Sequence, residues 1–554
     1  MSSPTDPQST PENPLSGHDT YTSPLAARNA SEAMLPLWSP RHKFNVWRRV
    51  WLAAATAQHL LTRNDPRPLV SAEQLDELRN FVLEGISDAQ MARAVELERE
   101  LKHDVMAHVH CLGEHCPKAK SIIHLGCTSQ DVVCNADLVV MMEATELIGL
   151  KVIRLLGSLG DAAGKWVALP TLGFTHYQPA QPTTVGRRLA GWASDLLYVH
   201  ECMDIQLETN RRWRGLRGAT GTQASFLQLL GGDSERVDRL EALFFDSFIY
   251  GKHMFGIEEE LLSDPENEES VDDDDAEIGY FDEDEGAFIV PAGTGTFELT
   301  GQTYPRVHDA ILLSNLASVA AVLHKIATDI RLLSNRKEID EPFGSKQIGS
   351  SAMPYKRNPM KCERICGLSR FVMNLVGNAY DTAATQWLER TLDDSSNRRL
   401  SLPEAFLALD GALDLMHEVA SGLVVHEAMV RKNLMAELPF LATENILMEA
   451  VKAGGDRQEL HEVIRVHAQA SGMRVKQEGL DNDLLERLKA DPNFQGKASG
   501  GRLDRDLDWE GLMDPMRYVG RSVHQTQEFL QRIEELKSYH KDDLESLDMP
   551  ESRV

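Results

Sequence analysis

The sequence has little that would place the protein in a membrane or a secretory pathway. No uninterrupted apolar run of about 18 residues occurs, so we expect no transmembrane helix and no membrane partner. Residues 1–20 are polar, rich in proline and serine, and lack the apolar core of a secretory signal. We therefore predict a disordered N-terminal lead over 1–20 and a cytoplasmic protein.

Cysteine is scarce and has no paired spacing. The chain has seven cysteines, an odd number, and none of them forms a CxxC motif. This usage is typical of reduced thiols in a cytosolic protein and argues against a disulfide framework or a zinc site. Cys111 and Cys116 lie near His108 and His110 in the sequence, but no second ligand pair follows at the usual spacing. We therefore predict no metal site.

Basic residues are fewer than acidic residues in this chain. There are 57 Lys and Arg against 85 Asp and Glu, which gives a formal net charge of −28. Residues 258–285 contain sixteen of the acids and no base. A chain this acidic is not expected to bind nucleic acid. The acidic segment itself has the composition of a solvated, disordered insertion.

Alternating strand patterns are rare, and the dominant pattern is helical. Residues 306–335 contain neither glycine nor proline. Their apolar positions step by four and three, which predicts a heptad seam on a helix about 45 Å long. The seam consists of Leu312, Leu316, Val319, Leu323, Ile326, Ile330 and Leu333. Further long helices are predicted near 131–157, 187–214 and 365–389.

One such rod has more apolar surface than it can cover alone, so we predict an all-α bundle completed by other subunits. The chain divides into an N-terminal helical domain over 21–128, a central bundle over 129–425 that carries the acidic insertion, and a C-terminal helical domain over 426–554. It has no glycine-rich phosphate loop and no GxSxG motif.

Five polar clusters interrupt the helical patterns. They are "KHDVMAHVH" (102–110), "HLGCTSQDVVCNAD" (124–137), "GFTHYQPAQPTTVGRR" (173–188), "GSSAMPYKRNPMKCE" (349–363) and "ERTLDDSSNRR" (389–399). Each has an ordinary structural explanation: Thr128 or Ser129 could cap a helix, "QPAQP" could form a turn, and His124 could be a core histidine. Their occurrence together in one helical chain favours a functional site.

Three of these clusters carry a family resemblance. "GSSAMPYKRNP" resembles the S-S-x-M-P-x-K-x-N-P signature loop of the fumarase/aspartase superfamily, and "HLGCTSQD" and "GFTHYQPAQPTTVG" resemble its two other shared regions. Within the superfamily, "HDVMAHVH", "GTQASFLQLL", "TGQTY" and "ERTLDDSSNRR" are most similar to adenylosuccinate lyases of the animal type. The resemblance covers about residues 20–540, and the acidic segment near 235–295 is longer than the family usually carries.

The resemblance implies an all-α fold of three domains, in which the central helices of a homotetramer form one bundle and three subunits meet at each active site. It implies β-elimination of fumarate from nucleotide substrates, namely adenylosuccinate and succinyl-aminoimidazole-carboxamide ribotide. No cofactor or metal is needed for this reaction.

The resemblance also implies residue roles. Ser350 corresponds to the catalytic base and His176 to the acid that protonates the leaving nitrogen. Glu363 is expected to orient His176, and His124 to have a supporting role. The substrate-binding residues implied are Arg28, His103, Asp104, Thr128, Ser129, Gln302, Lys356, Asn358, Arg364, Arg390, Ser395 and Arg399.

Two positions depart from the family pattern. Lys102 stands where the family usually has arginine, and it keeps the charge but loses the bidentate fork. Asn29 stands where the animal enzymes often have tyrosine, so an aromatic contact is lost.

Two alternatives remain open. A related lyase, such as argininosuccinate lyase or fumarase, acts on substrates without phosphate, which would leave the arginines and serine of "ERTLDDSSNRR" unexplained. A catalytically silent helical scaffold would have no need of Ser350, Lys356 and His176.

Overall fold

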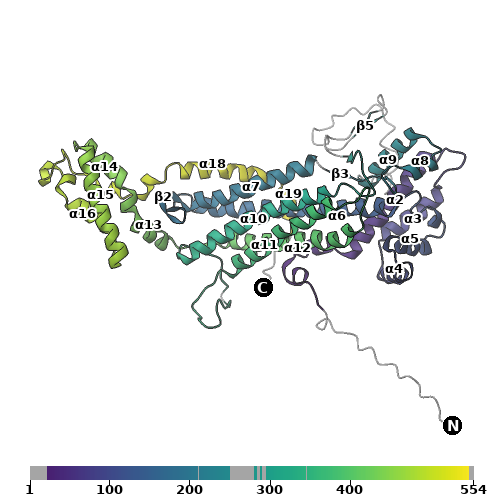
Figure 1. The fold of residues 1–554 in the computed structure, drawn as a ribbon, viewed down its shortest axis with the longest axis horizontal. Coiled ribbons are helices and arrows are strands. Elements are labelled where there is room, and N and C mark those ends of the chain that lie inside the picture. The colour runs from purple at the N-terminus through teal and green to yellow at the C-terminus, as the bar shows by residue number, and fades with distance from the viewer. Residues whose placement is uncertain are drawn as a thin grey trace, which may run out of the picture.

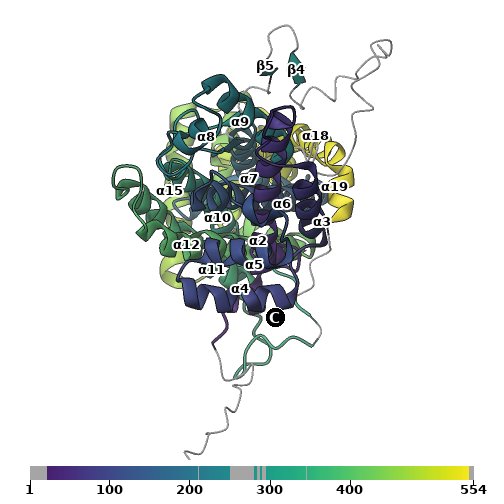
Figure 2. The same cartoon turned by 90° about the vertical axis from the view of Figure 1, so that its right-hand side faces the viewer.

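A computed structural model describes residues 21–209, 211–249, 280–282, 287–289, 295–344 and 346–547. Long helices run along the molecule, the N-terminal helices lie at one end and a smaller helical group lies at the other (Figure 1). Figure 2, viewed from the N-terminal end, shows α3, α4 and α5 in front of the long helices.

The helices fall into three consecutive groups. The first comprises η1 (Leu25–Asn29), α1 (Met34–Leu37), α2 (Pro40–Thr62), α3 (Ala72–Glu84), α4 (Asp88–Leu101), α5 (Asp104–His115) and η2 (Ala119–Ser121). The second comprises α6 (Ser129–Lys165), α7 (Val185–Thr209), α8 (Ala224–Leu229), α9 (Ser234–Ile249), α10 (Val307–Asn335), α11 (Met360–Ala384) and α12 (Asp393–Ser421). The third comprises α13 (Glu427–Leu441), α14 (Thr443–Lys452), α15 (Arg457–Met473), η4 (Arg474–Glu478), α16 (Leu484–Ala490), η5 (Pro492–Phe494), η6 (Lys497–Ser499), α17 (Trp509–Leu512), η7 (Pro515–Tyr518), α18 (Ser522–Tyr539) and α19 (Lys541–Ser546).

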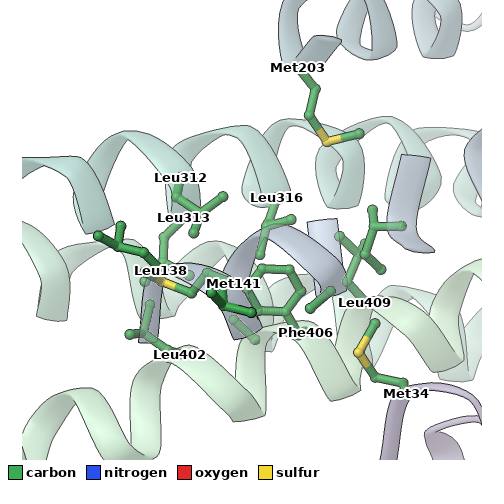
Figure 3. Packing of buried hydrophobic residues seen from close by; sticks show 14 of the residues in the cluster. Met34, Leu138, Met141, Met203, Leu312, Leu313, Leu316, Leu402, Phe406 and Leu409 are labelled. Atoms are coloured by element: carbon green, nitrogen blue, oxygen red, sulfur yellow. The ribbon is translucent and has the colours of Figure 1, made fainter. Parts of the chain in front are cut away.

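The heptad seam is confirmed on α10. All seven of its apolar residues are buried, and α10 packs against α11, α12 and α7. Leu312, Leu313 and Leu316 of α10 meet Leu138 and Met141 of α6 and Phe406 of α12 in the bundle core (Figure 3). The bounds of the other long helices differ from the prediction: α6 continues to Lys165, α7 ends at Thr209 before a short strand, and α11 begins at Met360 and ends at Ala384.

α10 is also the one helix among the described residues whose length and hydropathy would suffice to cross a membrane. Half of that apolar window is buried inside the bundle. A core helix of a bundle has the same composition, and the buried seam explains the apolar sequence of α10 by packing alone.

The buried apolar residues among the described ones form two large hydrophobic cores and a small cluster of Ala94, Leu97, Ala107 and Cys111 between α4 and α5. The main core is continuous from Leu25 to Val430 and includes Ile533, so the N-terminal helices and the bundle share it. A separate core lies between Ala442 and Leu512. α18 returns to pack on α6 and α7. The last helices therefore belong to the bundle by packing, although they follow the C-terminal group in sequence.

A β-hairpin replaces the turn expected at "QPAQP". β1 (Pro170–Thr175) pairs antiparallel with β2 (Gln178–Thr184), and Pro179 lies opposite Phe174. Prolines are tolerated here because a two-stranded ribbon has only edge strands, whose outer N–H groups need no partner. Three further ribbons occur: β3 (Arg212–Trp213) with β6 (Gly295–Thr296), β4 (Tyr280–Asp282) with β5 (Ala287–Ile289), and β7 (Ile339–Asp340) with β8 (Val424–Val425).

Two predicted segments lie mainly outside the described residues. The lead over 1–20 is not described, and of the acidic insertion over 258–285 only 280–282 is described, as β4. All seven cysteines are free. Cys111 is buried, and its thiol lies 3.4 Å from the carbonyl oxygen of Gln90.

Candidate active site

The first group of candidate residues lies where α5 and α6 begin. His103 is the N-cap of α5 and Thr128 is the N-cap of α6. Through these two turns, the Nε2 atom of His103 comes within 3.3 Å of the Ser129 hydroxyl. The Thr128 N–H donates to Asp131 at 2.6 Å, which confirms the predicted cap position and fixes the turn.

The start of α12 adds cationic residues to this group. Arg399 donates from Nη2 to Oδ2 of Asp104 at 2.8 Å, so α12 is tied to the start of α5. Arg390 donates from Nη1 to Oε1 of Gln302 at 3.0 Å. Ser395 lies one turn before Arg399, and both residues line a pocket with a volume of about 250 Å³.

His124 has a structural role at this end of the molecule, as a neutral ring. Its Nδ1 accepts a hydrogen bond from the indole N–H of Trp51 at 3.1 Å. Burial lowers the pKa of His124, so the ring is neutral near pH 7. Its backbone φ of 70° lies in the left-handed region, which sharpens the turn leading to Thr128.

Arg28 lies on the exposed face of η1, beside α12. The chain after η1 is anchored by Ser31, whose hydroxyl donates to Asp410 at 3.1 Å. Asp410 is buried and also pairs with Lys151 of α6. This anchor holds the segment that carries Arg28 against the bundle.

The second group is the loop that contains Ser350. The Ser350 hydroxyl oxygen accepts from the N–H of Met353 at 3.2 Å and from the N–H of Ala352 at 3.4 Å. Asn358 donates from Nδ2 to the carbonyl of Gly349 at 2.8 Å, which joins the two ends of the loop. Lys356 lies between them with an exposed side chain.

His176 occupies the tip of the β1–β2 hairpin. Thr175 pairs with Gln178, so His176 and Tyr177 form a two-residue turn, with φ values of 52° and 57°. Positive φ at both positions is the type I′ geometry, which favours glycine and asparagine and is strained for these residues. The imidazole of His176 is exposed at this turn, and it makes no hydrogen bond with the described residues.

Glu363 and Arg364 lie in the first turn of α11, directly after the Ser350 loop. Within the chain, Glu363 faces Arg331 of α10, with 3.9 Å between Oε1 and Nη2. No contact joins Glu363 to His176 in the part of the chain that the structure describes, so the predicted orienting role is not made within one subunit.

The candidate residues thus fall at opposite ends of long helices. α11 has 25 residues and separates Asn358 from Arg390 by about 37 Å at 1.5 Å per residue. The hairpin that carries His176 lies at the same end as the Ser350 loop, because Phe174 stacks under Arg336 just after α10. One chain therefore separates Ser350 and His176 from Arg390, Ser395 and Arg399.

Sequence reasoning missed the buried acids that hold the first group in place. Asp394 is 1% exposed, accepts from Arg306 Nε at 2.9 Å and lies 3.5 Å from Arg390 Nη2. Asp131 is fully buried, pairs with Arg214 and accepts the Arg217 N–H at 2.8 Å. For Asp394 the available signal was an acid followed by arginines within "LDDSSNRR", and it does not distinguish a buried acid from a solvated one. Among the described residues, no group of three or more His, Cys, Asp or Glu side chains could hold a metal ion.

Comparison with known proteins shows the family of this chain. The family model described as "Lyase" matches residues 30–226 and 294–374, and the model for the adenylosuccinate lyase C-terminus matches 439–529. Adenylosuccinate lyase of Schizosaccharomyces pombe is 41% identical over 94% of this chain and 95% of that protein. The Saccharomyces cerevisiae enzyme is also 41% identical, over 93% of this chain and 95% of its own.

Solved structures match the fold. A 3-carboxy-cis,cis-muconate lactonizing enzyme from Pseudomonas putida superposes with a TM-score of 0.69 at 21% identity, covering 92% of this chain and 99% of that one. A fumarate lyase from Mesorhizobium sp. BNC1 gives 0.67 at 20% identity, covering 91% and 98%. With relatives above 30% identity that match along nearly their whole length, this chain belongs to the adenylosuccinate lyase family.

Proposed function

We propose that the protein catalyses β-elimination of fumarate from adenylosuccinate, giving AMP, and from succinyl-aminoimidazole-carboxamide ribotide, in purine nucleotide synthesis. The reaction removes a weakly acidic proton from the carbon next to a carboxylate, and the C–N bond then breaks. It needs a base, an acid for the leaving nitrogen, and fixed positive or N–H groups around the carboxylate.

The observation that carries this proposal is the environment of the Ser350 hydroxyl oxygen. Two backbone N–H groups, from Ala352 and Met353, point at that oxygen. Amide donors favour the charged form of an oxygen acid, so they stabilise the alkoxide that proton abstraction requires. Lys356, in the same loop, adds positive charge for the developing aci-carboxylate. His176 then donates a proton to the departing nitrogen.

The polar residues Arg390, Ser395 and Arg399 support a phosphorylated substrate. Arg390 and Arg399 carry planar forks that suit phosphate oxygens, and the Ser395 hydroxyl can donate beside them. Fumarase and argininosuccinate lyase substrates lack phosphate and would leave this group without a ligand. A silent scaffold would need neither this group nor the amide-supported Ser350.

We further propose that the enzyme is a cytoplasmic homotetramer with sites shared between subunits. The separation of about 37 Å along α11 exceeds the length of one nucleotide substrate, so one chain cannot offer both groups to it. Packing the long helices of several chains side by side would bring the Ser350 loop of one subunit to Arg390 of another.

An absorbance assay tests the proposed function. Purified protein is mixed with adenylosuccinate, the change in purine absorbance is followed, and fumarate is quantified in the product. We expect AMP and fumarate in equal amounts, with no turnover of argininosuccinate or malate. Absence of fumarate from adenylosuccinate at saturating concentration would contradict the proposal.

A further inference from the structure

A pocket between α2, α6 and α12 contains a lysine to which the family resemblance assigns no role. The pocket has a volume of about 250 Å³. Its polar lining comes from Lys43 of α2, Asp137 of α6, and Ser395, Arg398 and Arg399 of α12, and its apolar lining includes Trp38 and Phe44. Ser395 and Arg399 are two of the residues proposed above to bind phosphate.

Lys43 is held in this pocket by aromatic rings. Its Nζ atom lies 5.1 Å from the ring centroid of Trp47 and 5.7 Å from that of Phe44. Such contacts hold a cation without using its hydrogen-bond donors. Burial lowers the pKa of Lys43, which means that its charge lacks part of the solvation that water would supply.

Lys43 has no ion-pair partner among the described residues. Asp137, the carboxylate that shares the pocket, accepts a hydrogen bond from Arg398 Nη1 at 2.7 Å. Arg398 is also paired with Asp309 at 2.7 Å, so its charge is compensated inside the protein. Arg399 gives one nitrogen to Asp104 and is half exposed. The cations left to face the pocket are therefore Lys43 and Arg399.

We propose that Lys43 binds the phosphate group of the nucleotide substrate together with Ser395 and Arg399. This inference rests on the proposed function and deepens it. Lys43 provides a point charge with three donors opposite the planar fork of Arg399, which lets the two cations contact different phosphate oxygens. Lys43 would then contribute to the preference for phosphorylated over unphosphorylated substrates.

The test compares adenylosuccinate with its dephosphorylated nucleoside. Lys43→Met keeps an unbranched side chain beside Trp47 and removes the charge, and Lys43→Arg keeps the charge. For Lys43→Met we expect kcat/KM to fall about 10- to 100-fold more for the nucleotide than for the nucleoside, as for loss of a hydrogen bond to a charged group. Lys43→Arg should restore most of the difference.

A matched control removes a lysine with the same kind of ring contact far from this pocket. Lys165, at the end of α6, lies 4.9 Å from the ring centroid of Trp166. Lys165→Met should leave the nucleotide-to-nucleoside ratio unchanged. An equal loss for both substrates in Lys43→Met would assign Lys43 a packing role and overturn the proposal.

A binding measurement separates this proposal from the proposed function. Inorganic phosphate is titrated into wild-type protein and into Lys43→Gln, and the increase in Tm is recorded. We expect a clear increase for wild type and at least a tenfold higher phosphate concentration for the same increase in the variant. Identical curves would overturn the role of Lys43. A wild-type enzyme inactive on adenylosuccinate would instead overturn the proposed function, and the phosphate titration would still decide the role of Lys43.

Discussion

Asn358 donates from its side-chain nitrogen to the carbonyl oxygen of Gly349 at 2.8 Å, and this bond closes the loop that carries Ser350 and Lys356. A Cβ atom on residue 349 would collide with the carbonyl of Lys356, so glycine is required for the close approach of the two loop ends. The sequence resemblance places Asn358 among the substrate-binding residues. In this chain one N–H of the side-chain amide holds the loop, which leaves the second N–H and the amide oxygen for a ligand or water.

Asn358→Ala should therefore loosen the loop more than it destabilises the protein. We expect kcat to fall at least tenfold, because Ser350 loses its fixed position, with a change in free energy of unfolding of about 1 kcal/mol. Hydrogen exchange of residues 346–358 should become faster in the variant. Asn374→Ala is the matched control, since Asn374 makes the same kind of amide-to-carbonyl bond on α11, to Arg370. Equal effects of the two substitutions on kcat would contradict this role.

Asp394→Asn should both weaken substrate binding through Arg390 and destabilise the fold. Asp394 is buried against the guanidinium of Arg306, and removing one charge of a buried pair costs about 3–5 kcal/mol. Arg390 loses the same neighbour, so KM for adenylosuccinate should rise. Thermal unfolding and steady-state kinetics measure the two effects.

The adjacent Asp393 is exposed on the same turn and offers the control. Asp393→Asn should change both quantities by less than half as much as Asp394→Asn. A KM unchanged in Asp394→Asn would show that Arg390 does not depend on this carboxylate.

His108 makes stability sensitive to acid. It stacks on Phe44 with 3.8 Å between ring centroids, and burial beside Arg48 lowers its pKa to about 4. In the unfolded chain the pKa is about 6.5, so the unfolded state binds more protons between these values. Stability is therefore lost as the pH falls from about 6.5 toward 4, by about 2 kcal/mol at pH 5.

His108→Phe keeps the ring stack and removes the titration. We expect the drop in Tm between pH 7 and pH 5 to be smaller in the variant than in wild type. An identical drop in both proteins would show that other groups cause the acid sensitivity.

The sequence was most informative where one periodic pattern ran without interruption. The seam from Leu312 to Leu333 has no glycine or proline within it, and burial of the whole seam in α10 followed the prediction. The hairpin at β1–β2 was missed because Pro179 and Pro182 argue against a strand, and only its position as a free ribbon makes them acceptable.

The candidate site was less predictable because its members are distant in sequence. The resemblance named Ser395 and Arg399, but no local pattern shows that α2 places Lys43 in the same pocket. Burial likewise cannot be inferred for Asp394 beside the exposed Asp393, because both stand in one acidic pair. Nor does a motif show that Ser350 and Arg390 lie at opposite ends of α11.

The most direct test of a site shared between subunits mixes two inactive variants. Ser350→Ala and His176→Ala should each abolish turnover, since each lacks one proton-transfer group, while Tm changes little because both residues lie in solvent-accessible turns. The two proteins are unfolded together, refolded as mixed oligomers and assayed with adenylosuccinate. If Ser350 and His176 of one site come from different chains, some mixed sites receive both wild-type residues, and up to about a quarter of wild-type activity should return. Mixed oligomers of confirmed composition that stay inactive would contradict a site in which different subunits supply Ser350 and His176.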